Sequence, residues 1–463
     1  MENNTARTFV LVGTIVSVLL FMHLLPQLSV AGTALRPVNM LSDVVPEVYG
    51  DDGEQGGLLQ QEAPLPLLAK VKAEEEEKKE AEKPKRPTRP VPKDMTPVID
   101  FSNGGIHGME GFYQALDKRK ELGRPVRIAY YGDSFIEGDI LTCQLRELLQ
   151  KKFGGSGAGW VDCGKTTNAG RPTIRQTTSG FASHSTMERK SFQSARQGIS
   201  QRYFTLEGSA QLTLSGTSWK PRNAQWEQAS LYFVTNGGMT IKGMPNGQEG
   251  QTFQPGASEE VQAVTVSDSM KQVKWTVGGA GAGDVFFGAV VEGRGGITLD
   301  NFAMRGCSGL SLASIPEATL RSFAQVRPYD LIIIHYGLNA AGPSSTDKSL
   351  NHYTTQMSKA IALFKRCFPE AAILVVGVSD RGQRAAGGVQ TMKGIELMLS
   401  HQKQMAQEEG VAFFSMFDAM GGRNAMAEFV KKGWAGKDYT HIGMKAGDHL
   451  GQKLYEAIVF GYE

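Results

Sequence analysis

The chain has 463 residues, and 41% of them are hydrophobic. This length is more than one compact core usually spans, so we expect two or more folded units with tails. The formal net charge is only +2 and the sequence indicates no sustained basic surface. This balance argues against nucleic acid as a partner, because nucleic-acid binding needs concentrated positive charge.

The N-terminal 31 residues are predicted to direct export. An apolar run covers residues 9–25, with Arg7 before it and the small residues Ser29 and Ala31 after it. The small residues fit a signal-peptidase site, whereas the length of the run is also nearly sufficient for a single membrane anchor. Residues 1–31 are therefore either a signal peptide or an N-terminal membrane anchor. Both alternatives predict an exported protein in the periplasm or cell envelope.

Residues 32–98 are predicted to form a disordered, charged and proline-rich linker. An acidic run at 73–80 passes into a stretch at 83–92 that combines basic residues with proline. The proline-rich part cannot form a helix and favours an extended polyproline-type spacer. We interpret the segment as a solvated tether between the export segment and a folded region.

An alternating strand and helix pattern begins at about residue 99. Short, nearly continuous apolar runs are typical of parallel strands that are covered on both faces, and they occur at 126–131, 330–336, 372–378 and 411–414. Helical patterns separate or follow them at 349–367, 391–409 and 443–458. The alternation predicts a doubly wound α/β domain in two parts, 99–195 and 300–463.

The region 196–299 has a different pattern. Short alternating segments at 211–214, 229–234 and 272–277 are broken by Gly, Asn and Pro turns, and no long helix is indicated. This pattern predicts an antiparallel β-sandwich inserted into the α/β domain. Its tryptophans Trp219, Trp226 and Trp275 either stack on a ligand or fill the core, and core filling is the more common use.

Three residues form a candidate nucleophilic triad. Ser134 follows the predicted strand 126–131, at the edge of an α/β sheet where ligands bind, and His441 and Asp438 lie just before the last predicted helix. A serine hydroxyl needs a base within hydrogen-bond reach, which His441 can supply. Asp438, three residues before His441, can turn back to orient the imidazole and stabilise its charged form.

Two further segments are predicted to open onto the same sheet edge. Gly309 follows an expected strand end, and Asn339 follows the predicted strand 330–336 directly. Acyl transfer requires hydrogen-bond donors aimed at the developing oxyanion. The backbone amides of Ser134 and Gly309 and the side-chain amide of Asn339 are the expected donors.

These motifs resemble the four blocks of the SGNH (GDSL-type) hydrolase superfamily. The blocks correspond to the Gly-Asp-Ser at 132–134, Gly309, the Gly-x-Asn at 337–339, and Asp438-x-x-His441. The resemblance implies a flavodoxin-like three-layer α/β/α fold, a catalytic triad of Ser134, Asp438 and His441, and an oxyanion hole of Ser134, Gly309 and Asn339. This sequence departs from the family pattern at Phe135, where leucine is usual, and at Ala340, where aspartate is usual.

A narrower resemblance is to the peptidoglycan O-acetylesterases of this superfamily. It is carried by the segments at 132–139, 157–161 and 419–422, and by an insert similar to their carbohydrate-binding-module-like domain. It implies removal of O-acetyl groups from a cell-wall glycan, with an O-acetylated polysaccharide as partner and no cofactor or metal. A polysaccharide O-acetyltransferase, an acetylesterase acting on another polysaccharide, and a lipase or thioesterase of the same fold remain alternatives. The oligomeric state is left open.

The four cysteines show no metal-ligand spacing. Export would permit a disulfide, for example between Cys143 and Cys163, whereas buried free thiols are equally compatible with the sequence.

Overall fold

The computed structural model describes residues 29–30, 33–34, 89–164, 170–188, 192–206 and 208–463. The chain divides into two compact units, Met1–Pro84 and Lys85–Glu463. In the first, the short strands β1 (Ser29–Val30) and β2 (Thr33–Ala34) pair antiparallel. The predicted export segment and linker lie mostly outside the described residues. Within the described ranges, no helix combines the length and the apolar character that a membrane crossing requires.

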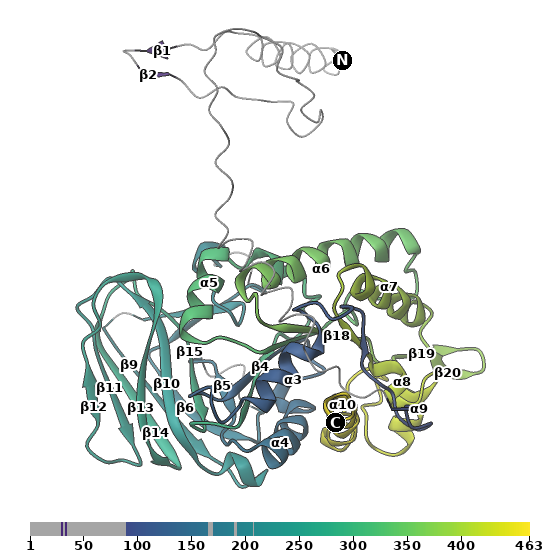
Figure 1. Cartoon of the computed structure of the whole chain (residues 1–463), viewed down its shortest axis with the longest axis horizontal. Coiled ribbons are helices and arrows are strands. Elements are labelled where there is room, and N and C mark those ends of the chain that lie inside the picture. The colour runs from purple at the N-terminus through teal and green to yellow at the C-terminus, as the bar shows by residue number, and fades with distance from the viewer. Residues whose placement is uncertain (1–28, 31–32, 35–88, 165–169, 189–191, 207) are drawn as a thin grey trace, which may run out of the picture. The chain divides into compact units, whose positions relative to one another are not determined.

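A mostly parallel sheet lies at the centre of the second unit (Figure 1). In the described part of the chain it has six strands in the order β16-β4-β17-β18-β21-β3. The first five are mutually parallel, and β3 pairs antiparallel with β21 at one edge. The strands are β3 (Ile99–Asp100), β4 (Val126–Gly132), β16 (Ile297–Ala303), β17 (Leu331–His335), β18 (Ala372–Gly377) and β21 (Ala412–Ser415). All residues of β4, β17, β18 and β21 are buried, which explains their continuous apolar runs.

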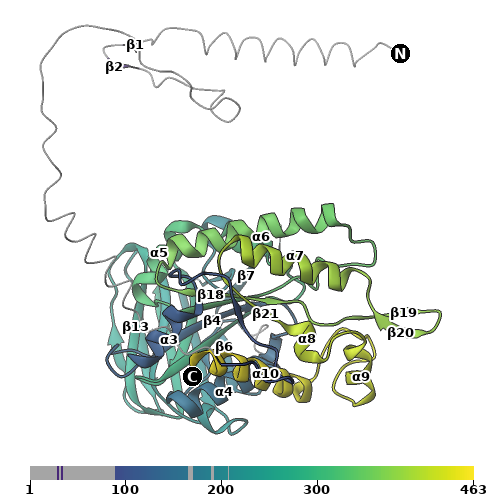
Figure 2. The same ribbon diagram turned by 45° about the vertical axis from the view of Figure 1, so that its right-hand side comes forward.

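Helices cover both faces of this sheet (Figures 1 and 2). Helices α6 and α7 lie on one side, and α4 and α10 pack together on the other. The longest, α6, begins with a capping box in which Thr346 and Ser349 exchange side-chain and backbone hydrogen bonds. The helices are α3 (Met109–Asp117), α4 (Thr142–Phe153), α5 (Glu317–Val326), α6 (Asp347–Cys367), α7 (Gly394–Glu408), α8 (Met416–Met420), α9 (Ala425–Lys431) and α10 (Met444–Tyr462).

Two antiparallel sheets lie beside the parallel sheet. Among the described residues, one contains β13-β10-β15-β8-β7 with β5 paired to β15, and the other contains β12-β11-β14-β9-β6. Leu212 and Trp275 of the second sheet share an apolar core with Leu231 and Phe286 of the first. The strands are β5 (Gly159–Val161), β6 (Ile174–Ser179), β7 (Ala182–Ser185), β8 (Arg202–Thr205), β9 (Gly208–Gly216), β10 (Trp226–Thr235), β11 (Thr240–Pro245), β12 (Gln251–Phe253), β13 (Ser258–Met270), β14 (Gln272–Ala280) and β15 (Val285–Glu292).

The predicted mixed α/β class is confirmed. The domain limits remain a prediction, and the antiparallel sheets take strands from both sides of the expected boundary at residue 196, since β5, β6 and β7 precede it. All four cysteines lie in the described part of the chain, and each is buried and free, so Cys143 and Cys163 are not paired. Trp226 is buried in the core between the antiparallel sheets, whereas Trp219 is exposed.

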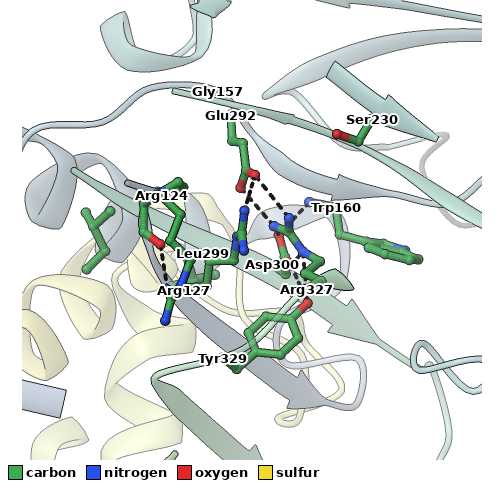
Figure 3. Close-up of polar contacts among 12 residues, drawn as sticks. Arg124, Arg127, Gly157, Trp160, Ser230, Glu292, Leu299, Asp300, Arg327 and Tyr329 are labelled. Carbon is green, nitrogen blue, oxygen red and sulfur yellow. Dashed lines mark hydrogen bonds and ion pairs between the residues drawn. The ribbon is translucent and has the colours of Figure 1, made fainter. Parts of the chain in front are cut away.

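A network of buried charges joins the antiparallel strands to the parallel sheet (Figure 3). The guanidinium of Arg327, which follows α5, donates to Asp300 on β16 at 2.7 and 2.9 Å and to Glu292 at the end of β15 at 3.0 and 3.2 Å. Arg127 on β4 also donates to Glu292, at 2.9 Å, and the Tyr329 hydroxyl donates to Asp300. Each carboxylate is therefore balanced by an arginine where water is excluded, a condition that makes a buried charge tolerable.

Burial of Glu292 would raise its pKa, but the charges of Arg127 and Arg327 lower it to about 2. Glu292 is therefore ionised at neutral pH, and removing an arginine partner leaves its charge less compensated in the interior.

We expect Arg327→Met to lower the free energy of unfolding by about 3–5 kcal/mol, because Asp300 loses its arginine and Glu292 keeps only Arg127. Urea denaturation followed by circular dichroism measures this change. The control is Arg321→Met, which removes an exposed ion pair with Glu317 on α5 and should cost less than about 1 kcal/mol. Equal losses in the two variants would contradict the role given to the buried network.

Candidate active site

Ser134 lies in a tight turn at the carboxyl end of β4. Gly132 ends the strand where a Cβ atom would lie 2.9 Å from the Ile136 side chain and 3.1 Å from the His335 carbonyl oxygen, so a larger residue would displace these neighbours. The turn leads into a short 3-10 helix, Glu137–Asp139, and α4 begins only at Thr142. Ser134 therefore lies outside the first turn of α4, beyond the range over which the dipole of that helix acts strongly.

Three strand ends meet at this turn. The last residue of β4, Gly132, is in register with Ala303 of β16 and with His335 of β17. The segments that follow these strands carry Ser134, Gly309 and Asn339, respectively. Because parallel strands end at one edge of the sheet, the predicted site segments are neighbours for a topological reason.

The structure brings Ser134, His441 and Asp438 together in one hydrogen-bonded series. His441 Nε2 lies 3.2 Å from Ser134 Oγ, and His441 Nδ1 lies 2.6 Å from Asp438 Oδ2. A carboxylate only accepts hydrogen bonds, so Nδ1 carries the proton and Nε2 is free to accept from the serine hydroxyl. This is the geometry that a base needs in order to activate a serine.

The loop before α10 fixes His441. The His441 carbonyl oxygen accepts a hydrogen bond from the Gly436 amide at 2.8 Å. In the same loop, Tyr439 adopts a φ of 55°, which is uncommon for a residue other than glycine. Helix α10 then packs against the segment that follows the nucleophile. A Cβ atom on Gly447 would lie 1.9 Å from the Ile140 carbonyl oxygen, so only glycine allows this approach.

Asp438 is held in its charged form. Its partial burial would raise its pKa, but hydrogen bonds from the His441 ring and from the backbone amides of His441 and Thr440 lower the pKa below its ordinary value. An ionised Asp438 can orient the imidazole and stabilise the imidazolium that forms when His441 takes a proton.

Two of the expected oxyanion donors, Asn339 and Gly309, already have acceptors. Asn339 Nδ2 donates to Asp133 Oδ2 at 2.9 Å and to the Cys307 carbonyl oxygen at 3.1 Å. The Gly309 amide donates to Cys307 Sγ at 3.3 Å, and Gly309 itself has a φ of 90°. The role of Asn339 and Gly309 toward an oxyanion stays a prediction, because a substrate oxygen would have to replace these acceptors.

Two acidic residues beside Ser134 have environments that the sequence did not reveal. Asp133 is buried and accepts from the Phe135 amide and from Asn339, both at 2.9 Å. Burial raises its pKa from the ordinary value of 3.8 to about 6, although these hydrogen bonds act in the opposite direction. Asp139 is fully buried with a φ of 63°.

Asp139 anchors the segment that follows the nucleophile. It accepts from Arg146 at 2.9 and 3.0 Å, from Arg171 at 2.9 Å and from Asn301 at 2.9 Å. Burial would raise the pKa of Asp139, but the two arginines hold it well below its ordinary value. Arg171 is buried and is part of this internal ion-pair network. The spacing of Asp139 and Arg146 by two helical turns is a weak local signal, whereas nothing local points to Arg171 or Asn301.

No protein-family model matches the chain, and no curated protein matches it. A solved structure described as "Peptidoglycan O-acetylesterase in action, 5 min" superposes with a TM-score of 0.62 over 78% of this chain and 98% of that chain, at 19% sequence identity. The chain has the fold of a peptidoglycan O-acetylesterase. This likeness supports the predicted relation to SGNH hydrolases in fold.

A family two carbohydrate esterase from Clostridium thermocellum, in complex with cellohexaose, also matches, at 13% identity over 57% of this chain and 95% of that chain. Its TM-score is 0.27. A family two carbohydrate esterase from Cellvibrio japonicus covers 63% of this chain and 100% of its own, at 10% identity and a TM-score of 0.26. We draw nothing further from superpositions this low.

We expect Asp133→Asn to remove a pH-dependent part of the stability. The native pKa of about 6 lies above the ordinary 3.8, so the native state keeps a proton that the unfolded state has lost. The stability that Asp133 contributes is therefore complete below pH 3.8 and is lost as the pH rises through about 6. Relative to the variant, the free energy of unfolding of the wild type should fall by about 3 kcal/mol across this window.

Urea denaturation of both proteins near pH 4 and near pH 7 measures this difference, in which titrations common to both cancel. Ser134→Ala, at the adjacent and half-buried position, is the control and should differ from the wild type by a constant amount. A difference between the wild type and Asp133→Asn that does not change with pH would contradict the raised pKa.

Proposed function

We propose that the protein is an exported serine esterase of the SGNH type that removes O-acetyl groups from a cell-wall glycan, with peptidoglycan as the first candidate. The observation that carries this proposal is the hydrogen-bonded series of Ser134, His441 and Asp438, with links of 3.2 and 2.6 Å. The fold shared with a peptidoglycan O-acetylesterase supports the choice of substrate class.

In the proposed reaction, Ser134 Oγ attacks the acetyl carbonyl carbon while His441 Nε2 accepts the hydroxyl proton. The imidazolium is stabilised by the Asp438 carboxylate and then donates the proton to the sugar oxygen as the ester bond breaks. Water, deprotonated by His441, attacks the acetyl-enzyme, and acetate leaves with Ser134 restored. The series of residues is half-exposed, so water can reach the intermediate.

The oxyanion would bind to the backbone amides of Ser134 and Gly309 and to the side chain of Asn339. For Asn339 this requires that one Nδ2 hydrogen leave the Cys307 carbonyl or the Asp133 carboxylate. Each well-placed donor of this kind contributes about 3–4 kcal/mol to the transition state. We infer that the donors rearrange when substrate binds.

We further infer that the parallel sheet is flavodoxin-like. Numbered along the chain, the five parallel strands have the order 2-1-3-4-5, which is that of flavodoxin-like sheets. Their switch point lies between β4 and β17, where Ser134 and Asn339 follow the strand ends. We interpret the molecule as a three-layer α/β/α hydrolase domain with an inserted β-sandwich. Export through residues 1–31, with or without a retained membrane anchor, is part of the proposal.

Acetate release from O-acetylated peptidoglycan tests the proposed activity. We expect purified residues 85–463 to release acetate, and Ser134→Ala to reduce the rate by at least about 10³-fold because the nucleophile is lost. O-acetylated xylan is the control substrate. Release from xylan alone would keep the esterase mechanism and change the glycan. If acetate appears from neither substrate but acetyl groups move to an added glycan, the protein is an O-acetyltransferase.

Asp438→Asn tests the orientation of His441. An amide can donate to Nδ1 and thereby favour the wrong tautomer, so we expect kcat on 4-nitrophenyl acetate to fall by about 10³–10⁴-fold. The rate should be measured together with the far-ultraviolet circular dichroism spectrum, which should not change. Thr440→Val, which keeps the backbone hydrogen bond to Asp438, is the control and should retain most of the activity. A fall of less than tenfold for Asp438→Asn would remove Asp438 from the proposed triad.

A further inference from the structure

A cavity of about 320 Å³ lies beside the candidate active site. Two wall residues, Thr186 and Met187, follow strand β7 of an antiparallel sheet. The remaining lining comes from the segment after β16, with Gly306, Cys307 and Ser308, and from the start of the 3-10 helix Leu310–Ser314, with Leu310 and Ser311. The cavity is therefore built jointly by the β-rich region and by the loop that carries Gly309.

Side-chain contacts connect this cavity to the nucleophile turn. Asn339 Nδ2 contacts both the Cys307 carbonyl oxygen and the carboxylate of Asp133, the residue before Ser134. On the same loop, Arg305 Nε donates to Glu137 Oε2 at 2.7 Å, three residues after the serine. The cavity wall and the nucleophile turn are thus separated by one side chain.

Hydrogen bonds hold the cavity wall in place. Gln201, at the turn before β8, is fully buried and has a φ of 62°. Its Nε2 donates to the Tyr336 hydroxyl at 3.1 Å, and its Oε1 accepts from the Ser311 hydroxyl. The Tyr353 hydroxyl donates to the Ser308 carbonyl oxygen at 2.7 Å. These bonds hold the loop from both sides, which reduces the ordering cost of binding.

The described residues of the cavity lining combine hydroxyl groups with apolar surface. Among the described residues that line the cavity, none is charged. Thr186, Ser308 and Ser311 supply hydroxyl groups, while Met187 and Leu310 supply apolar surface. A pyranose ring combines hydroxyl groups on its edge with apolar C–H groups on its faces, so it matches both kinds of lining. The volume is near the lower end of the roughly 300–1,000 Å³ that small-ligand sites occupy.

We propose that this cavity is a subsite for one neutral sugar ring of the glycan that carries the scissile ester, and that Met187 packs against the face of that ring. The inference rests on the proposed esterase function and extends it, because it assigns to the β-rich region one wall of the substrate site. The side chain of Met187 is exposed in the free protein, at 49% of its surface, and would be covered by the ligand.

The test compares a substrate that fills the subsite with one that does not. We expect Met187→Ala to lower kcat/KM on O-acetylated glycan fragments at least fivefold more than on 4-nitrophenyl acetate, through a higher KM. Thr186→Trp, which places a large side chain in the cavity, should also lower kcat/KM more on the glycan fragments than on 4-nitrophenyl acetate, and by a larger factor than Met187→Ala. Ile106→Ala is the matched control, an apolar side chain of similar exposure (53%) that is outside the cavity lining. For Ile106→Ala, kcat/KM on the glycan fragments and kcat/KM on 4-nitrophenyl acetate should both equal the wild-type values.

Equal losses on both substrates, or none on either, would overturn the subsite. If the wild type releases acetate from no glycan, the esterase proposal fails separately and the subsite is tested by binding. The Ser134→Ala protein is then titrated with the neutral tetrasaccharides chitotetraose and xylotetraose by calorimetry. Weaker binding of either sugar after Met187→Ala, but not after Ile106→Ala, would support the subsite. Absence of binding to both sugars, or binding that ignores both substitutions, would reject it.

Discussion

The packing of α10 against the segment after the nucleophile is the contact on which the candidate site depends. At Gly447 and Gly451 the backbone of α10 approaches the carbonyl oxygens of Ile140 and Leu141 so closely that a Cβ atom could not be accommodated. This approach places the loop before α10, and with it His441, beside Ser134, which is 307 residues away in sequence. A substitution on this helix face would therefore act on the site without touching a catalytic group.

Buried ion pairs supply a second constraint on the fold, because they connect segments that are distant in the sequence. Asp139 joins the turn after Ser134 to Arg171, and Arg327 joins β16 to the end of β15. Replacing such groups by apolar residues of similar volume is often no less stable, but leaving one of them unpaired is costly. In this protein their contribution is to position segments, because each buried carboxylate holds together chain segments that are distant in the sequence.

The β-rich region contributes residues beside the candidate active site. Its strand β7 leads into Thr186 and Met187, and Gln201 reaches beneath the loop that carries Gly309. A site assembled from both regions can combine an ester-cleaving centre with recognition of a neighbouring sugar ring. His441 and Asp438 are half-exposed, which suits the polymeric substrate that we propose, because a long glycan must approach an open surface.

The sequence by itself determined the mixed α/β class and the residues of the candidate triad, because continuous apolar runs reflect strands buried on both faces, and motifs at strand ends reflect one sheet edge. It did not show that β5, β6 and β7 join the antiparallel sheets, or that Asp139 and Arg171 form a buried pair. Nor did it show that the Asn339 amide is already engaged. These features depend on pairings between distant segments, which local periodicity does not record and only the tertiary structure decides.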